Sequence, residues 1–298
     1  MTTAGRRAGF GLAAACLLVG WGTSVVVAPK SAVAAPPAAP PAPALQDDDA
    51  RESAEYNGQD LTRPQRSFET RFEFQTSERA TSRTDRDRMI LRYNSKIDLA
   101  AGWKLGLLAQ VPLVDKTTTT VDPQSSDTTA GVGDSAFQAT LSHAIDRNWA
   151  FGFGARLVAP TAEDALGSGK WQIMPGFGVR YSILDLGPDT YFVPAVRYAL
   201  SFAGDPGRRS ISQPQFAPTL NVGLPDRWFV TFYPSYDIRI NYGDPVPGQT
   251  GRLFLPFDVA VGRKITNDLT MSIETSVPLI SDYPVYNFKT ELRIIMRF

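Results

Sequence analysis

The residue types that most often perform catalysis or bind metals are scarce in this chain of 298 residues. It contains one histidine, His143, and one cysteine, Cys16, which excludes a disulfide framework and a zinc site built from histidine and cysteine ligands. Ser142 adjoins His143, but neighbouring residues of a strand point to opposite faces and cannot form a nucleophile–base pair. The segment 167–169 lacks the spacing of a phosphate-binding loop, and the run 47–49 lacks a calcium-binding pattern. We therefore expect no catalytic residue, no metal, no cofactor and no enzyme.

Charged side chains are the other candidates, and they alternate with apolar ones along the chain. Phe68, Phe72 and Phe74 share one face of a segment whose other face is charged, which is the period of a β-strand with two different faces. An arginine or lysine that faces lipid costs about 2–4 kcal/mol at the bilayer midplane, so in a membrane barrel the charged face must point inward. By alternation, the expected pore-lining residues are Glu69, Arg71, Glu73, Arg92, Lys96, Arg156, Arg180, Asp237, Arg239, Glu274 and Arg293.

Two arrangements of these charges remain open. Opposite charges could pair across the interior and fill it, which would give a structural barrel. Alternatively, they could line a narrow aqueous path and set its selectivity. A barrel of about twelve strands lies between filled eight-stranded barrels and wide porins, so size does not decide between the two.

The alternating pattern continues to the last residue in about twelve segments of about 11–15 residues each. A tilted membrane strand needs about 9–11 residues, whereas strands of globular proteins have about 5–6. The pattern therefore favours an all-β, antiparallel transmembrane β-barrel over residues 66–298 rather than a soluble all-β domain. The segments lie near residues 67–78, 87–99, 103–114, 132–145, 148–160, 170–183, 189–202, 213–224, 227–241, 253–264, 268–280 and 286–298.

The expected connections alternate in length. Short turns follow every second segment, and longer polar loops follow most of the others, notably residues 79–86, 115–131, 161–169, 203–212 and 242–252. Outer-membrane barrels combine short periplasmic turns with longer extracellular loops. An even number of strands then places both chain ends of the barrel on the periplasmic side.

Aromatic residues mark one end of the expected strands. Trp103, Trp149 and Trp228 each lie close after a short turn and on the apolar face. Amphipathic indoles prefer the boundary between membrane and water, so we expect these residues and Phe298 to form a membrane girdle; core packing in a soluble sandwich is the alternative. A terminal Phe298 after an alternating strand resembles the signal read by the outer-membrane barrel assembly machinery, which we expect as a partner beside outer-membrane lipid.

The N-terminal segment has the features of an export signal. Arg6 and Arg7 precede an apolar run that ends near Ala28 and is followed by small residues, which indicates a signal peptide over residues 1–35; an uncleaved anchor is the alternative. Residues 36–65, rich in alanine, proline and acidic residues, are expected to form a periplasmic tether without regular structure. Basic and acidic residues number 30 each, which gives no reason to expect a nucleic-acid partner.

Prolines fall inside several of the expected strands. Each proline lacks an N–H and loses a ladder hydrogen bond, and a closed barrel has no edge at which to place it. We expect bulges or membrane-boundary positions there. The prolines are Pro112, Pro175, Pro194, Pro218, Pro234 and Pro256.

Four short motifs resemble those of an outer-membrane transporter family known as meta-pathway of phenol degradation proteins. They are Gly131–Asp134, Ala159–Thr161, Gly167–Trp171 and Pro175–Gly178. The resemblance is best over residues 100–185. It implies an outer-membrane β-barrel channel, in some members linked to the breakdown of aromatic compounds, and it implies no catalytic residues.

These features predict an outer-membrane channel that passively conducts a small solute, aromatic or anionic, through a charge-lined interior. The first alternative is a non-conducting barrel that serves as a structural or adhesion scaffold. The second is an outer-membrane lipid-modifying enzyme, because outer-membrane phospholipases use a lipid-facing serine–histidine pair in a barrel of this strand count. A histidine at the membrane interface is the simpler interpretation of His143.

Overall fold

The computed structural model describes residues 61–121, 124–163, 165–187 and 189–298. The expected signal peptide and the expected tether up to residue 60 lie outside the described residues. The strands are β1 (Ser67–Arg79), β2 (Ser82–Asp98), β3 (Trp103–Val121), β4 (Gln124–Val132), β5 (Ser135–Ala144), β6 (Trp149–Ala159), β7 (Lys170–Ser182), β8 (Tyr191–Gly204), β9 (Ser212–Gly223), β10 (Trp228–Phe232), β11 (Ile238–Ile240), β12 (Leu253–Lys264), β13 (Leu269–Ser281) and β14 (Phe288–Arg297).

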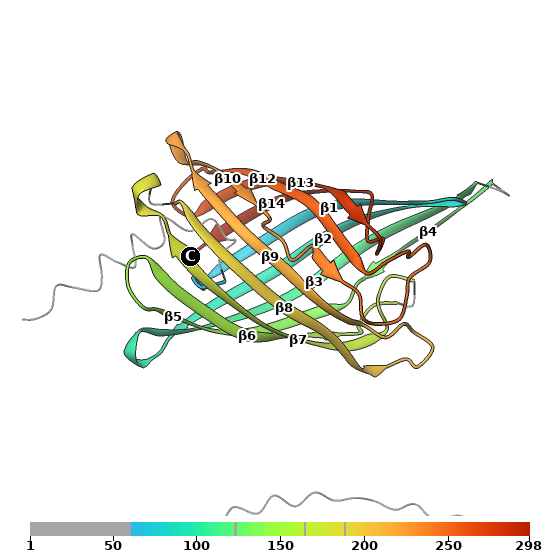
Figure 1. The fold of residues 1–298 in the computed structure, drawn as a ribbon, viewed down its shortest axis with the longest axis horizontal. Coiled ribbons are helices and arrows are strands. Elements are labelled where there is room, and N and C mark those ends of the chain that lie inside the picture. Colours follow the sequence, from blue (N-terminus) through green and yellow to red (C-terminus); the bar gives the residue numbers. More distant parts are fainter. Residues whose placement is uncertain (1–60, 122–123, 164, 188) are drawn as a thin grey trace, which may run out of the picture. The chain divides into compact units, whose positions relative to one another are not determined.

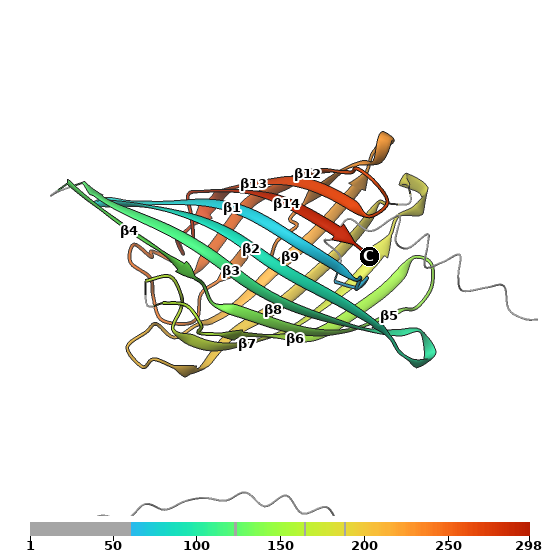
Figure 2. The ribbon, with the colours of Figure 1, turned by 180° about the vertical axis from the view of Figure 1, so that it is seen from behind.

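The strands form one closed antiparallel barrel, seen in Figure 1 and from behind in Figure 2. The sheet closes where β1 pairs with β14, from Ser67 opposite Arg297 to Thr76 opposite Phe288. Two positions in the wall are each shared by two strands: β4 and β5 both pair with β3, and β10 and β11 both pair with β9 and β12. The 14 strands therefore make a barrel of 12, which confirms the predicted fold class.

The two ends of the barrel differ. Short connections, including 3-10 turns at Ala100–Gly102, Leu184–Leu186 and Pro225–Arg227, lie together with the C-terminus at one end, which we call the short-turn end. The longer connections, such as residues 160–169, 205–211 and 241–252, lie at the opposite end, called the long-loop end.

Two of the expected loops are wrong. Residues 115–121 and 124–131 belong to the paired strands β3 and β4, and the expected loop 79–86 shrinks to a turn between paired strands. These strands extend beyond their neighbours at the long-loop end (Figure 1). Hydroxyl groups bond across the hairpin, with Thr117 and Thr128 3.0 Å apart. The prediction failed because this hairpin is polar on both faces, so the apolar alternation stops before the strand does.

The in-strand prolines are accommodated in different ways. Pro256 lies at a register shift in the β12–β13 ladder, as expected for a bulge, and Pro234 falls in the break between β10 and β11. Pro112 lies where β3 changes its partner from β5 to β4. Pro194 and Pro218 oppose each other in the β8–β9 ladder without a register shift. A bulge is therefore only one of several solutions to the missing N–H.

A hydrogen-bonded corner forms where β4 ends and β5 begins. The Asp134 carboxylate accepts hydrogen bonds from the amide and the hydroxyl of Ser168, both at 2.7 Å, and the Thr161 hydroxyl donates to the Gly133 carbonyl at 2.9 Å. A Cβ atom at Gly167 would lie 2.4 Å from Asp134 Oδ1, so only glycine fits there. Three of the four motifs that resemble the transporter family thus meet at this corner.

Side chains alternate between the two surfaces of the barrel. Along β13, Met271, Ile273 and Val277 are exposed on the outside, whereas Ser272 and Glu274 are buried inside. The barrel therefore has an apolar outer surface and a polar interior, the reverse of a soluble domain. Among the described residues, no helix has the length and apolar character needed to cross a membrane.

Candidate functional site

The barrel interior holds a cavity of about 320 Å³ that is lined mostly by polar and charged side chains. Most of the residues predicted to line the pore border this cavity, namely Glu69, Arg71, Glu73, Arg92, Arg156, Asp237, Arg239 and Arg293. The other three do not: Glu274 is buried in the wall, and Lys96 and Arg180 lie near the short-turn ends of β2 and β7.

One side of the interior is a network of paired charges on β1, β13 and β14. Arg293 lies 2.5 Å from Glu291, 3.2 Å from Glu274 and 3.3 Å from Glu69. Arg71 bonds to the same Glu69 carboxylate at 2.6 Å. Buried charges persist where they are paired and hydrogen-bonded, so this side of the barrel is internally compensated.

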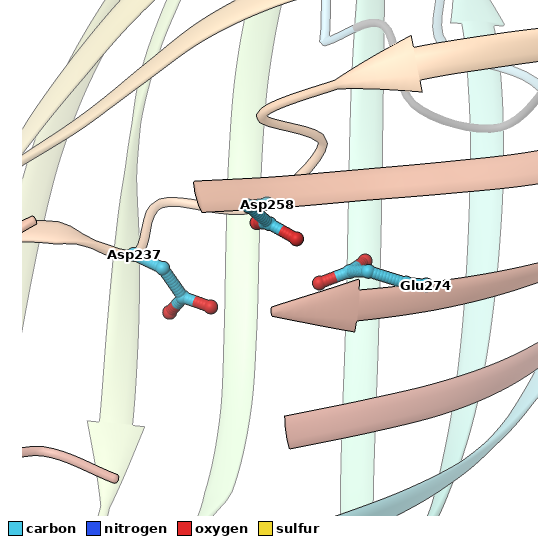
Figure 3. A group of neighbouring side chains, drawn as sticks. All are labelled: Asp237, Asp258 and Glu274. Atoms are coloured by element: carbon cyan, nitrogen blue, oxygen red, sulfur yellow. The ribbon is translucent and has the colours of Figure 1, made fainter. Parts of the chain in front are cut away.

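Glu274 of this network forms a cluster of three buried carboxylates with Asp237 and Asp258 (Figure 3). Their ligand oxygens lie within 4.8 Å of one another, which is the geometry of a possible cation site. The Lys289 ammonium group, however, contacts both Asp237 and Glu274. The lysine therefore already supplies the positive charge, while the two carboxylate oxygens of Asp258 have no hydrogen-bond partner.

The opposite side of the interior carries arginines that bond to neutral amides. Gln110 Oε1 accepts a hydrogen bond from Arg156 at 2.9 Å. It also accepts one at 2.8 Å from Arg92 of β2, which in addition pairs with Glu69 of the network at 3.3 Å. Arg197 donates to Gln215 Oε1 at 2.6 Å, and its guanidinium carbon lies 4.4 Å from the ring centre of Tyr236. Within the part of the chain that the structure describes, neither Arg156 nor Arg197 forms an ion pair with a carboxylate.

The residues just before β1 lie inside the barrel near its short-turn end. Leu61 packs against the buried cluster of Tyr191, Val193 and Ala195, and Arg63 is buried. The inner wall makes room for this segment with glycines. Cβ atoms at Gly152 and Gly178 would lie 2.9 and 3.0 Å from the Leu61 side chain, and one at Gly106 would lie 2.7 Å from Pro64 Cβ. The described end of the expected tether thus narrows the interior.

A buried aromatic cluster lies at the long-loop end. Phe254, Tyr283 and Tyr286 form a buried aromatic cluster, with the rings of Phe254 and Tyr286 edge to face at a centroid distance of 4.8 Å. The Tyr286 hydroxyl donates to Asp237 at 3.2 Å, which ties the connection before β14 to the charged interior.

The residues expected to form the girdle lie at the short-turn end. Trp103, Trp149 and Trp228 are the first residues of β3, β6 and β10. Trp149 and Trp228 are exposed on the outer surface, and Phe298 stacks near Tyr93 with 6.3 Å between ring centres. This placement suits a membrane boundary, and contact with lipid stays a prediction.

His143 belongs to an aromatic cluster on the outer surface. Its ring stacks on Trp103 at a centroid distance of 4.9 Å and meets Phe151 at 5.9 Å, and its Nδ1 has no hydrogen-bond partner. Ser142 is buried in the interior instead. His143 therefore cannot act as the base for Ser142.

Several residues that line the interior were not predicted from the sequence to do so. Leu61 lies outside the alternating segments, and Gln110 and Gln215 were not named. Arg197 was placed on the same face as Tyr191 and Val193 but was not included among the expected pore-lining residues. A signal was present: β5, β6, β7, β8 and β9 contain no aspartate or glutamate. A long run of inward-facing positions without acidic residues leaves arginines on that side without nearby partners.

Comparisons with known proteins agree with this architecture. The fold is similar to that of an outer membrane channel from Pseudomonas putida F1, with a TM-score of 0.59 and 16% identity over 79% of this chain and 96% of that one. It is also similar to the transport unit of the autotransporter AIDA-I from Escherichia coli, with a TM-score of 0.50 and 8% identity over 85% of this chain and 97% of that one. At these identities the likenesses show the barrel fold alone. A search of curated proteins finds no match.

The match to a protein family is more specific. The family model described as "Putative MetA-pathway of phenol degradation" matches residues 71–276, from within β1 to within β13. This span includes the corner at Asp134 and the glycines of β6 and β7 that face the interior. Because the model matches well over half of the sequence, the chain belongs to the family of that description.

Proposed function

We propose that this protein is an outer-membrane channel that passively conducts a small solute through its barrel. The observation that carries the proposal is the polar cavity of about 320 Å³ inside a wall whose outer surface is apolar. Lipid outside and water inside suit these two surfaces. The family, and the likeness to an outer membrane channel, support the same conclusion. In this proposal the short-turn end faces the periplasm and the girdle tryptophans lie at the membrane boundary.

Planar-bilayer recording tests the proposal. Purified full-length mature protein, refolded in detergent and added to a bilayer in potassium chloride, should give discrete conductance steps. Because the cavity is small and the segment from Leu61 narrows it, we expect steps smaller than those of a wide porin. Protein denatured before addition is the control. Failure to observe steps, although the protein inserts into the membrane, would remove the channel function.

A non-conducting structural barrel is the second candidate, and one observation favours it. The charges on β1, β13 and β14 pair with one another, as they would in a barrel whose charges serve to fill it. The same recording separates the two functions. We infer that Ser142 and His143 do not form the serine–histidine pair of a lipid-modifying enzyme, because they lie on opposite surfaces of the wall.

A further inference from the structure

The inner wall of the barrel is electrically uneven. The acidic residues of the network and its neighbours Asp237 and Asp258 lie on β1, β12, β13 and β14 and in the bend before β11. The strands β5–β9 contain no aspartate or glutamate, yet they contribute Arg156 and Arg197 to the interior. A solute in the cavity therefore meets compensated charges on one side and arginines without carboxylate partners on the other.

Arg156 and Arg197 retain unused hydrogen-bond donors. A guanidinium group has five N–H donors, and the bonds to Gln110 and Gln215 use only part of them. Neither side chain has a nitrogen that is both buried and without a partner. Within the described residues, their remaining N–H groups therefore face open space rather than the packed wall.

That open space is a recess of about 70 Å³ lined by both arginines together with Gly154, Gly176 and Tyr236. Gly176 lies opposite Gly154 on β6 and opposite Arg197 on β8, and a Cβ atom there would lie 3.1 Å from Arg197 Cβ. Gly154 and Gly176 thus place no side chain in the recess. Both arginines also line the larger cavity, so the recess opens on the space through which a solute would pass.

We propose that Arg156 and Arg197 form a binding subsite for an oxyanion group, a carboxylate or a phosphate, of the solute that enters the barrel. The planar fork of arginine matches the paired oxygens of both groups. Gln110 and Gln215 hold each fork through one oxygen without neutralising it, and Tyr236 stacks on Arg197, which fixes its orientation. An anion bound between the two arginines would supply the negative charge that the strands β5–β9 do not provide. The subsite rests on the proposed function only in that its ligand is taken to be the conducted solute. Binding of an oxyanion can be measured whether or not the barrel conducts.

Isothermal titration calorimetry tests the subsite. The protein without the expected signal peptide, residues 36–298, is titrated in non-ionic detergent with sodium benzoate and with inorganic phosphate as separate probes. At least one probe should bind, and the variant Arg156→Gln/Arg197→Gln should weaken that binding about tenfold or more. Arg147→Gln, which removes a positive charge from an exposed turn, is the matched control and should bind as the parent does. Preference for benzoate or for phosphate identifies which oxyanion the subsite takes.

Arg156→Lys separates recognition from charge. This variant keeps the positive charge but loses the planar fork of arginine, so its affinity for the oxyanion probe should fall. The positive charge should still favour chloride over potassium in the current, so reversal potentials in a potassium chloride gradient should match those of the parent. Native-like mobility of unheated protein on electrophoresis shows that each variant folds, and each arginine is changed singly if the double variant does not. Binding of neither probe, or equal binding by the arginine variants and the parent, would overturn the subsite. Binding without conductance would remove the channel and leave the subsite in place.

Discussion

At the scale of single residues, the interior depends on a few cations that hold buried carboxylates in place. Lys289 contacts both Asp237 and Glu274, and all three side chains are almost fully buried. Replacing Lys289 by methionine keeps much of its volume but leaves these carboxylates without their shared cation. Because breaking a buried pair leaves an uncompensated charge, Lys289→Met should lower the free energy of unfolding by about 3–5 kcal/mol. Equilibrium unfolding in urea with lipid vesicles measures this loss.

A solvent-exposed pair gives the comparison. Arg83 pairs with Asp85 at 3.0 Å, and about half of its side chain is exposed. Such pairs contribute about 0–1 kcal/mol, so Arg83→Met should change stability very little. Equal losses in the two variants would mean that water reaches Lys289 freely and that the network does not hold the interior together.

The inward direction of these residues was predictable from the sequence, but their partners were not. Alternation by two places Arg156 on the inner surface whatever strands surround it. Its bond to Gln110 joins residues 46 positions apart, and it depends on the order and register of β3, β5 and β6. The bend that brings Asp237 to Lys289 lies between β10 and β11, where the alternation is interrupted. Residue-level pairing therefore required the structure.

At the scale of elements, the segment from Leu61 to β1 has the clearest functional consequence. It occupies the interior near the short-turn end because glycines on three strands leave space for it. A methyl group at Gly106 would lie 2.7 Å from Pro64 Cβ, in a proline ring that cannot rotate away. Gly106→Ala should therefore displace the segment and raise single-channel conductance in planar bilayers.

The control and the cross-check use the same measurement. Gly207→Ala places a methyl group in a loop, with its nearest neighbour at an ordinary 3.4 Å, and should leave conductance unchanged. Deleting residues 36–65 should raise conductance by itself, and Gly106→Ala should then add nothing further. An additive effect of the two changes would show that the alanine acts on the wall and not through the segment.

The elements themselves were predicted unevenly, for a physical reason. Segments with a polar face turned inward and an apolar face turned outward show a clear two-residue period in the sequence. Their predicted bounds lie close to those of the observed strands. The β3–β4 hairpin has no such contrast, because residues 117–120 and 125–129 are polar on both faces. Its threonines favour strands, but that preference is weaker than the alternation that defined the other elements. Leu61, outside any periodic segment, gave no sign that it enters the barrel.

At the scale of the whole molecule, closure follows from the pattern along the full chain. A strand with an apolar outer face and a charged inner face needs neighbours of the same kind on both sides, and only a closed sheet gives every strand two such neighbours. The sequence therefore predicted the barrel more securely than any single contact inside it. The same reasoning requires lipid around the outer surface, which leads to a direct test.

Two isoleucines of the outer surface distinguish a lipid-facing wall from a surface in water. Ile273 lies within β13, and Ile265 lies in the turn before it; both are exposed, at 55% and 47%. In a bilayer, lysine costs about 2–4 kcal/mol near the midplane and about 0–1 kcal/mol at the boundary. Ile273→Lys should therefore destabilise the protein in phosphatidylcholine vesicles far more than Ile265→Lys, as measured by urea unfolding. If both positions faced water, both lysines would be solvated alike. Equal losses of stability in vesicles would therefore show that β13 does not face hydrocarbon and would contradict a membrane-spanning channel.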